Sequence, residues 1–401
     1  MRSPAWTGLL GADPTEWLLT SGEPAAVWIA RTALVPGAPC QTAPDAGEDS
    51  EKARRAVLKD AGTQELISRI PDWEVESQVS GHNSPKYAPN LLLLLNDMGV
   101  RGGDDCRVER VLDQMCAHQD ACSHFQSYGR SGHGSIGRLA EPVWGSLLCD
   151  HHAITQVLIR YGRGDDPRVR AAVDRMAQDI TATAQGPAWP CIPDPASGFR
   201  GPGRKADFCP QVTVEALKAF ALLRDEARPA QGPGAGHEAG HGAMPGAASN
   251  VVHGAVRTLI GAWIRRSTEQ PYMFGHGYRF KIVKWPTFWY DVHAVLDAIA
   301  GYPEVWAAAP SGSPERRAVS EMAACLVAYN FGPDGKVTPK SCYKGFESFS
   351  FGQKKRPSPF ATARLASLLK RFEPLAVETQ AVDIRTLASS KGGSGTPVPP
   401  K

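Results

Sequence analysis

Apolar residues recur three and four positions apart along most of the chain, which is the spacing of a helix with one buried face. No segment sustains the alternation of apolar and polar residues that indicates a strand. Loops rich in Gly, Pro and Ser separate the periodic segments. The pattern therefore predicts an all-α protein. The predicted helices cover residues 16–34, 51–70, 87–98, 105–118, 148–161, 167–180, 212–223, 250–264, 290–299, 314–329 and 361–372.

The predicted helices are of two kinds. Residues 90–95, 153–159 and 214–223 are apolar on most faces, as in a helix that is buried on all sides. The helices that follow an Asp-Asp pair carry a charged residue every few positions, as in a half-exposed outer helix. We expect inner and outer helices to alternate in tandem helical hairpins, as in an α/α-toroid or an α-solenoid.

The Asp-Asp pairs belong to a repeated phrase, residues 103–115 and residues 164–176. Asp104 and Asp165 lie 61 positions apart, about the length of two helices with their loops, so the repeat indicates stacked helical units. Each pair stands where a helix would begin, and there a carboxylate can cap free backbone N–H groups. Pro167 suits the first helical position. Capping explains these residues better than a catalytic acid pair does.

Residues 1–386 are predicted to form one toroid domain. Residues 224–249 are rich in Gly, Ala and Pro and predict a flexible internal loop, in which metal capture by His237 and His241 is not expected. Residues 387–401 are polar and rich in Pro and Gly, and they predict a disordered tail.

Charge and composition exclude several classes of protein. The chain has 44 basic and 41 acidic residues, and its net charge of +3 does not indicate a nucleic-acid-binding protein. No apolar run approaches the roughly 20 residues of a transmembrane helix. The first residues lack the apolar stretch of a secretion signal, so we expect a cytoplasmic protein. Nine cysteines are few for a disulfide scaffold of this length, and the number is odd.

Three cysteines stand near the starts of predicted inner helices. If consecutive inner helices pack side by side, Cys149, Cys191 and Cys209 lie at the same level. Three thiolates and one imidazole form a tetrahedral zinc site, for which His152 is a better candidate than His151. The alternative is that the three thiols are buried as small apolar groups.

An aromatic segment and a basic loop are further candidates for a ligand site. Residues 274–291 mix aromatic rings with cations, which suits an apolar ligand with an anionic head or a carbocation held over ring faces. Residues 354–356 precede a predicted inner helix and could bind phosphate. The alternatives are rings that wedge helices apart and a solvated basic loop. The candidate catalytic residues are His276, Arg279, Tyr290 and Asp291, and the candidate anion-binding residues are Lys281, Lys354, Lys355 and Arg356.

The order of several short phrases resembles the prenyltransferase and squalene-cyclase repeat superfamily, and in particular a little-characterised bacterial branch of it. The phrases are Ser21-Gly22-Glu23-Pro24-Ala25, Gly99-Val100 leading to Asp104-Asp105, residues 161–169, Trp189-Pro190-Cys191, Cys209-Pro210, Phe288-Trp289-Tyr290-Asp291 and residues 351–355. The resemblance implies a toroid with a central cavity, and in the wider superfamily that cavity handles isoprenoids. Proteins of the branch typically carry cysteines like Cys149, Cys191 and Cys209.

The chain departs from the catalytic patterns of that superfamily. It has no DxDD motif, which supplies the acid of class II terpene cyclases. Asp291 and His293 precede an inner helix, but no cysteine follows at the distance expected of a protein prenyltransferase zinc site. Despite these departures, the resemblance implies a prenyltransferase-like or terpene-cyclase-like enzyme that acts on an isoprenoid or similar apolar molecule, and the cysteines predict a Cys/His zinc site. The alternative is a non-catalytic toroid that binds a ligand or a partner protein, with a purely structural metal.

Overall fold

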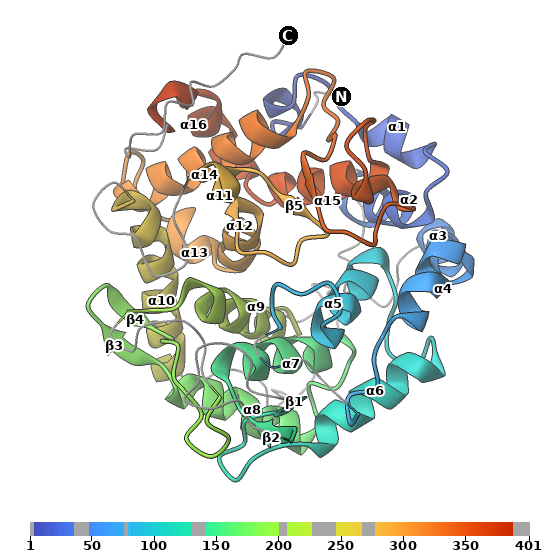
Figure 1. The fold of residues 1–401 in the computed structure, drawn as a ribbon. Helices are drawn as coiled ribbons and strands as arrows, with labels where there is room; N and C mark the ends of the chain where they lie inside the picture. The colour runs from blue at the N-terminus through green and yellow to red at the C-terminus, as the bar shows by residue number, and fades with distance from the viewer. Residues whose placement is uncertain are drawn as a thin grey trace, which may run out of the picture.

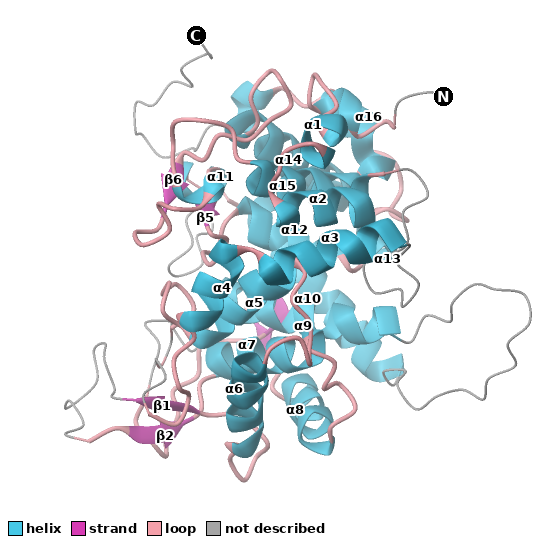
Figure 2. Cartoon of the chain, turned by 90° about the vertical axis from the view of Figure 1, so that its right-hand side faces the viewer, coloured by secondary structure: helices cyan, strands magenta, loops and turns pink. Residues whose placement is uncertain are grey.

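The computed structural model describes residues 4–35, 48–75, 79, 81–129, 141–199, 207–226, 246–266 and 277–387. In these residues the chain is mostly helical and the strands are only two or three residues long (Figures 1 and 2). The prediction of a helical protein is confirmed at this level. No helix among the described residues combines the length and the hydropathy needed to cross a membrane.

The longer helices lie close to the predicted segments. They are α3 (Glu48–Lys59), α4 (Ala61–Ser68), α5 (Ala88–Met98), α6 (Cys106–Ala117), α7 (Leu148–Arg160), α8 (Pro167–Gln178), α9 (Pro210–Glu226), α10 (Gly246–Ile264), α12 (Val292–Ala300), α14 (Pro314–Asn330) and α15 (Pro359–Lys370). The shorter helices are α1 (Thr15–Leu19), α2 (Pro24–Ile29), α11 (Tyr278–Lys281), α13 (Pro303–Trp306) and α16 (Ala376–Gln380).

Two predicted helices are each divided into shorter pieces. The segment 16–34 forms α1, a turn at Gly22 with φ +72°, α2 and a π-helical turn over Ala30–Leu34. Glycine suits the turn because its missing Cβ removes the steric cost of a positive φ. The segment 51–70 is divided at Asp60, whose carboxylate caps α4 by accepting from the backbone N–H of Thr63 at 2.9 Å. A polar cap within an apolar periodic segment therefore starts a new helix.

The short strands were not expected from the sequence. β1 (Ser127–Gly129) pairs antiparallel with β2 (Val143–Gly145), and β3 (Thr181–Thr183) pairs antiparallel with β4 (Gly186–Ala188). β5 (Lys284–Trp285) pairs in parallel with β6 (Ser341–Cys342). Segments this short contain too few residues for their alternation to show in the sequence.

Six helices contact one another in cyclic order. α2 contacts α5, α5 contacts α7, and α7 contacts α9; α9 contacts α12, α12 contacts α15, and α15 contacts α2. Figure 1 shows these helices following one another around the middle of the molecule. The apolar segments predicted to be inner helices lie in α5, α7 and α9, and in α7 every residue but Arg160 is buried.

Four further helices pack on the outside of these six (Figure 1). α6 contacts α7 and α4, α8 contacts α7, α10 contacts α9, and α14 contacts α12 and α10. On α8 only Val169, Ala172 and Met176 are buried, which is the single apolar stripe of a half-exposed helix.

Hydrogen bonds join the regions of α2 and α15, which are the first and the last of the six helices in the sequence. Lys370, at the end of α15, donates to the backbone carbonyl of Ala33 at 2.6 Å. The carboxylate of Glu23, just before α2, accepts from the Ser350 hydroxyl at 3.1 Å and from the backbone N–H of Phe360 at 3.4 Å. The burial of Glu23 raises the pKa of its carboxyl group, although both hydrogen bonds oppose that shift. The contact between α2 and α15 is thus supported by polar bonds as well as packing.

Regular structure extends into the edges of the two segments that were predicted to be irregular, 224–249 and 387–401. Helix continues to Glu226 in α9 and begins again at Gly246 in α10, so both ends of the predicted loop 224–249 are helical. Residues 227–245, including His237 and His241, lie outside the described residues. Leu387, the first residue of the predicted tail, ends a 3₁₀ turn and is buried. Residues 388–401 also lie outside the described part of the chain.

The second aspartate of each repeated pair is a helix cap. Asp105 accepts from the backbone N–H of Arg107 at 2.8 Å, and Asp166 accepts from that of Arg168 at 2.8 Å. The capping interpretation of these residues is confirmed. The hydrogen bond from the Arg168 side chain lowers the pKa of Asp166 to about 2, so this cap is ionised at neutral pH.

We predict that Asp166→Ala lowers the free energy of unfolding by about 1 kcal/mol, because the first turn of α8 loses its cap. Asp165→Ala is the matched control, since the side chain of Asp165 is 97 % exposed and contacts only the exposed Arg170 among the described ion pairs. Its effect should be close to zero. Urea denaturation of both variants measures the difference, and equal losses of stability would contradict the capping role.

Candidate functional site

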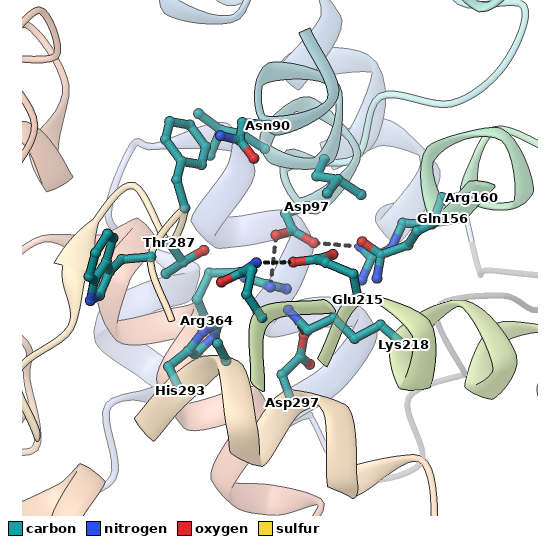
Figure 3. A pocket seen from close by; sticks show the side chains of 16 residues that line it. Asn90, Asp97, Gln156, Arg160, Glu215, Lys218, Thr287, His293, Asp297 and Arg364 are labelled. Atoms are coloured by element: carbon teal, nitrogen blue, oxygen red, sulfur yellow. Dashed lines mark hydrogen bonds and ion pairs between the residues drawn. The ribbon is translucent and has the colours of Figure 1, made fainter. Parts of the chain in front are cut away.

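A polar cavity lies where five of the six cyclically packed helices face one another (Figure 3). It contains about 520 Å³ of space free of atoms, part of which is open to solvent. Charged and amide side chains from α5, α7, α9, α12 and α15 share the lining with a few apolar residues from α5, from α12 and from the loop before α12. The polar lining residues are Asn90, Asp97, Gln156, Arg160, Gln211, Glu215, Lys218, Thr287, His293, Asp297 and Arg364.

The carboxylate of Asp97 bridges two guanidinium groups inside this cavity. Arg160 approaches one carboxylate oxygen at 2.8 Å, and Arg364 approaches the other oxygen at 2.8 Å. The three side chains are only 12–18 % exposed, so their charges are poorly screened by water. Because the residues come from α5, α7 and α15, one carboxylate connects three helices that are distant in the sequence.

A second ion pair joins α9 to α12. Lys218 lies 3.3 Å from Asp297, and both side chains are 15 % exposed. Burial alone would raise the pKa of Asp297, but the positive charges of Lys218 and of nearby arginines outweigh it and lower the pKa. Asp297 is therefore an anion at neutral pH. The bridge at Asp97 and this pair account for all three cations that line the cavity.

Glu215 is the cavity carboxyl group whose environment favours the neutral form. Burial raises its pKa, and the charge of Asp297 acts in the same direction, whereas Lys218 and Arg160 oppose the shift. One carboxyl oxygen accepts from the Gln211 amide at 2.8 Å. The other oxygen is buried without a hydrogen-bond partner among the described residues. Glu215 and Asp297 thus share a cavity while their pKa values are shifted in opposite directions, as in pairs of catalytic carboxyl groups.

His293 lines the cavity as a neutral imidazole. The residue is 2 % exposed, and its burial lowers the pKa of the ring to about 3. The charge of Asp297 opposes this shift, while the charges of Arg364 and Lys218 add to it. Nδ1 of the ring has no partner among the described residues. A neutral imidazole can donate from one nitrogen and accept at the other.

Six buried polar atoms of the cavity residues lack a hydrogen-bond partner in the described part of the chain. They are Nε2 of Gln156, Nε of Arg160, Oε1 of Gln211, Oε2 of Glu215, Nδ1 of His293 and Nε of Arg364. An unpaired buried polar group costs about 1–3 kcal/mol, so natural proteins tolerate few of them unless a ligand or water completes the bonding. Nineteen such atoms occur among the described residues, and these six lie around one cavity.

The four predicted zinc ligands are placed near the amino-terminal ends of α7 and α9. An antiparallel bridge between Pro190 and Phe208 brings Cys191 and Cys209 near each other. Burial raises the pKa of the Cys209 thiol to about 12, and the nearby Cys191 adds to the shift. The thiol of Cys149 instead contacts the Asp150 carboxylate at 3.6 Å.

His152 is bonded to the backbone rather than to a thiol. Its Nδ1 lies 3.0 Å from the carbonyl oxygen of Val212, and burial lowers the pKa of its ring to about 4. The described residues contain no group of three or more His, Cys, Asp or Glu side chains with the geometry of a metal site. Zinc binding by Cys149, His152, Cys191 and Cys209 therefore stays a prediction, without support from the described geometry.

The aromatic segment 274–291 reaches the cavity through Thr287, Phe288 and Trp289, not through its predicted catalytic residues. Tyr290 and Asp291 are buried next to the lining rather than in it. Asp291 caps α12 through the backbone N–H of Ala294 at 3.1 Å, and burial raises its pKa to about 7. Arg279 is exposed on α11, and His276 lies outside the described residues.

The predicted anion-binding residues do not line the cavity. Lys281 is buried and donates to the backbone carbonyl of Leu387. Lys354, Lys355 and Arg356 are exposed on the loop before α15. Of the two interpretations of that loop, a solvated basic segment fits these positions better than a phosphate site in the cavity.

The sequence does contain a sign of the residues that line the cavity, which is a row of polar residues along one face of an otherwise apolar helix. On α9 the polar residues Gln211, Glu215 and Lys218 follow a spacing of four and three, which puts them on one face of an otherwise apolar helix. Gln156 and Arg160 on α7 have the same relation. A polar stripe on a helix that is otherwise buried requires polar partners or a polar cavity.

Comparisons of the chain with models of protein families, with curated proteins and with solved structures gave no match.

We predict that Asp97→Asn lowers the free energy of unfolding by about 3 kcal/mol, because it leaves two poorly solvated guanidinium groups without their counter-ion. Asp113→Asn is the control: this carboxylate also pairs with an arginine, Arg163, but its side chain is 71 % exposed. The control should lose less than about 1 kcal/mol. Equal, small losses in denaturant titrations would show that the Asp97 bridge does not hold the helices together.

Proposed function

We propose that the chain is an α/α-toroid whose central cavity binds a small polar molecule. The cyclic order of contacts among α2, α5, α7, α9, α12 and α15 supports the toroid. The outer positions of α6, α8, α10 and α14 support it further, since a toroid alternates inner and outer helices. The same arrangement supports membership of the prenyltransferase and squalene-cyclase repeat superfamily as part of the proposal.

The observation that carries the proposed function is the set of six unpartnered buried polar atoms in one cavity. A core that served only for stability would replace such groups with apolar ones or pair them with one another. Gln156 lies on α7 and Glu215 lies on α9, and each has one unbonded polar atom beside the cavity (Figure 3). Gln211, also on α9, has a third. A ligand that donates and accepts hydrogen bonds would complete them.

The cavity supports general acid catalysis as a second part of the proposal. Burial raises the pKa of Glu215, which is the direction expected of a general acid. The neighbouring Asp297, with its lowered pKa, can stabilise a positive charge that develops as the proton is transferred. A non-catalytic binding protein would use the same cavity without this proton transfer.

The isoprenoid substrate inferred from the resemblance stays a prediction. An apolar chain entering this cavity would remove water from the charged side chains of the lining without replacing its hydrogen bonds, which is costly. The apolar part of the lining is confined to Leu93, Leu94, Phe288, Trp289 and Ala294. The lining therefore favours a polar ligand over an isoprenoid.

We predict that Gln156→Leu leaves the stability of the free protein unchanged or raises it by about 1 kcal/mol, because it removes an unpaired buried amide. Gln114→Leu is the matched control, since the Gln114 amide accepts from the backbone N–H of Trp73 at 3.1 Å and donates to Asp72 at 3.0 Å. The control should lose about 1–2 kcal/mol. Denaturant titration compares the two, and a similar loss for both would mean that Gln156 serves the fold rather than a ligand.

A further inference from the structure

His124 lies between two carboxylates, outside the lining of the central cavity. Its Nδ1 lies 3.1 Å from Oδ2 of Asp120, and its Nε2 lies 2.9 Å from Oδ2 of Asp179. The side chains of His124, Asp120 and Asp179 are 15 %, 26 % and 5 % exposed, so water screens their charges poorly. An imidazole donates from both nitrogens only when it is protonated. A neutral ring would leave an unprotonated nitrogen facing one of the two carboxylates.

Both carboxylates are held in place by further hydrogen bonds. Asp120 accepts from the backbone N–H of His124 at 2.9 Å and from the Ser146 hydroxyl at 2.9 Å. Burial would raise the pKa of Asp120, but these bonds and the charge of His124 outweigh it and lower the pKa. Oδ1 of Asp179 accepts from Nε of Arg175 at 2.8 Å. Burial would likewise raise the pKa of Asp179, but hydrogen bonds from His124 and Arg175 lower it, so both carboxyl groups are anions at neutral pH.

The charge of the His124 ring depends on these two anions. Burial would lower its pKa, but the hydrogen bond to Asp179 and the charges of Asp179 and Asp120 raise it. His151 and His152 on α7 also face this region, and the ring of His151 lies 5.0 Å from that of His124. Burial lowers the pKa of His152 to about 4 and holds that of His151 well below its usual range. Both rings on α7 are therefore neutral near neutral pH, and only His124 among the three histidines changes its charge there.

The contact with Asp179 connects two separate elements. Asp179 directly follows α8, whereas Asp120 and His124 belong to the loop between α6 and β1. A backbone hydrogen bond from the N–H of Asp120 to the carbonyl of His124, at 2.9 Å, closes this loop on itself. The two residues therefore stay together within the loop, and the bond to Asp179 joins the loop to the end of α8.

Loss of one proton from His124 weakens this connection. A single ring N–H then remains for two carboxylates. Nε of Arg175 lies 3.2 Å from Nε2 of His124 and can donate to that nitrogen once it is unprotonated. The same N–H already bonds to Asp179, so the replacement is shared and weaker than a bond from a charged imidazolium. Oδ2 of Asp179 is left facing a nitrogen lone pair.

We propose that His124 is a proton-controlled clasp: its protonated ring fastens the loop 118–126 to the end of α8, and loss of the proton loosens the loop. The inference stands independently of the ligand of the central cavity. Because the folded state raises the pKa of His124 above its ordinary value of 6.5, the clasp stabilises the fold fully below that value. The stabilisation is lost as the pH rises through the higher pKa of the folded state.

The test is denaturant titration of the full chain, wild type and His124→Gln, at about pH 5.5 and about pH 9, on either side of the histidine range. At the lower pH the variant should reduce the ratio of folded to unfolded protein at least about tenfold, because charge-assisted hydrogen bonds are lost. At the higher pH the reduction should be less than about threefold, because wild type has lost these bonds too. Comparing the two proteins at each pH cancels the titration of unrelated groups such as Asp291.

Cys122→Ser is the matched control in the same loop. The thiol of Cys122 is exposed and takes no part in the clasp, so its replacement should leave the change of stability between the two pH values as in wild type. A pH response that disappears in Cys122→Ser and persists in His124→Gln would overturn the proposal.

Nuclear magnetic resonance of isotope-labelled histidine gives a second readout, which does not depend on the folding of His124→Gln. The pKa of the His124 ring in wild type should lie above 6.5, and Asp179→Asn should lower it. A wild-type pKa at or below 6.5 would contradict the clasp. An equal loss of stability for His124→Gln at both pH values would also contradict it, because the ring would then have a structural role only.

Discussion

The arrangement of the inner helices depends on a buried carboxylate held between two arginines. Asp97 connects α5 to α7 through Arg160 and to α15 through Arg364, and both distances are 2.8 Å. Buried ion pairs add little net stability compared with apolar packing, but removing one partner is costly because it leaves an uncompensated charge. A change of register between these helices would separate Asp97 from one or both arginines. The bridge also keeps the middle of the helices polar, and that is where the cavity lies.

The parts of the fold that bury hydrophobic surface are separate from the polar cavity at its centre. The apolar faces of the inner helices and the single stripes of the outer helices bury the hydrophobic surface that stabilises the fold. Apolar packing elsewhere can offset the cost of side chains whose hydrogen bonds are incomplete, such as those of Gln156 and Glu215. Glu215 and Asp297 illustrate the result. Both are carboxyl groups in one small space, and their surroundings shift their pKa values in opposite directions.

Much of the fold could be predicted from the sequence, whereas the residues that line the cavity were missed. The spacing of apolar residues located α5 to α8 to within about two residues at each end, because burial of one face imposes the helical period. Divisions such as the one at Asp60 depend on a local cap, which an apolar period does not reveal. The predicted site residues lie in short segments that are rich in cysteine, aromatic or basic residues. The cavity is instead assembled from isolated polar residues, such as His293 and Arg364, on helices that meet only in the folded chain.

We propose that six helices surround a cavity whose polar groups bond to a ligand. The decisive experiment is a crystal structure of the purified protein at a resolution that shows ordered water. We expect α2, α5, α7, α9, α12 and α15 to form a closed ring. We also expect ordered density, from water or a bound molecule, within hydrogen-bond distance of Gln156, Glu215 and His293. An open arrangement of these helices would refute the proposal, and so would a collapsed centre in which the same three side chains bond to one another.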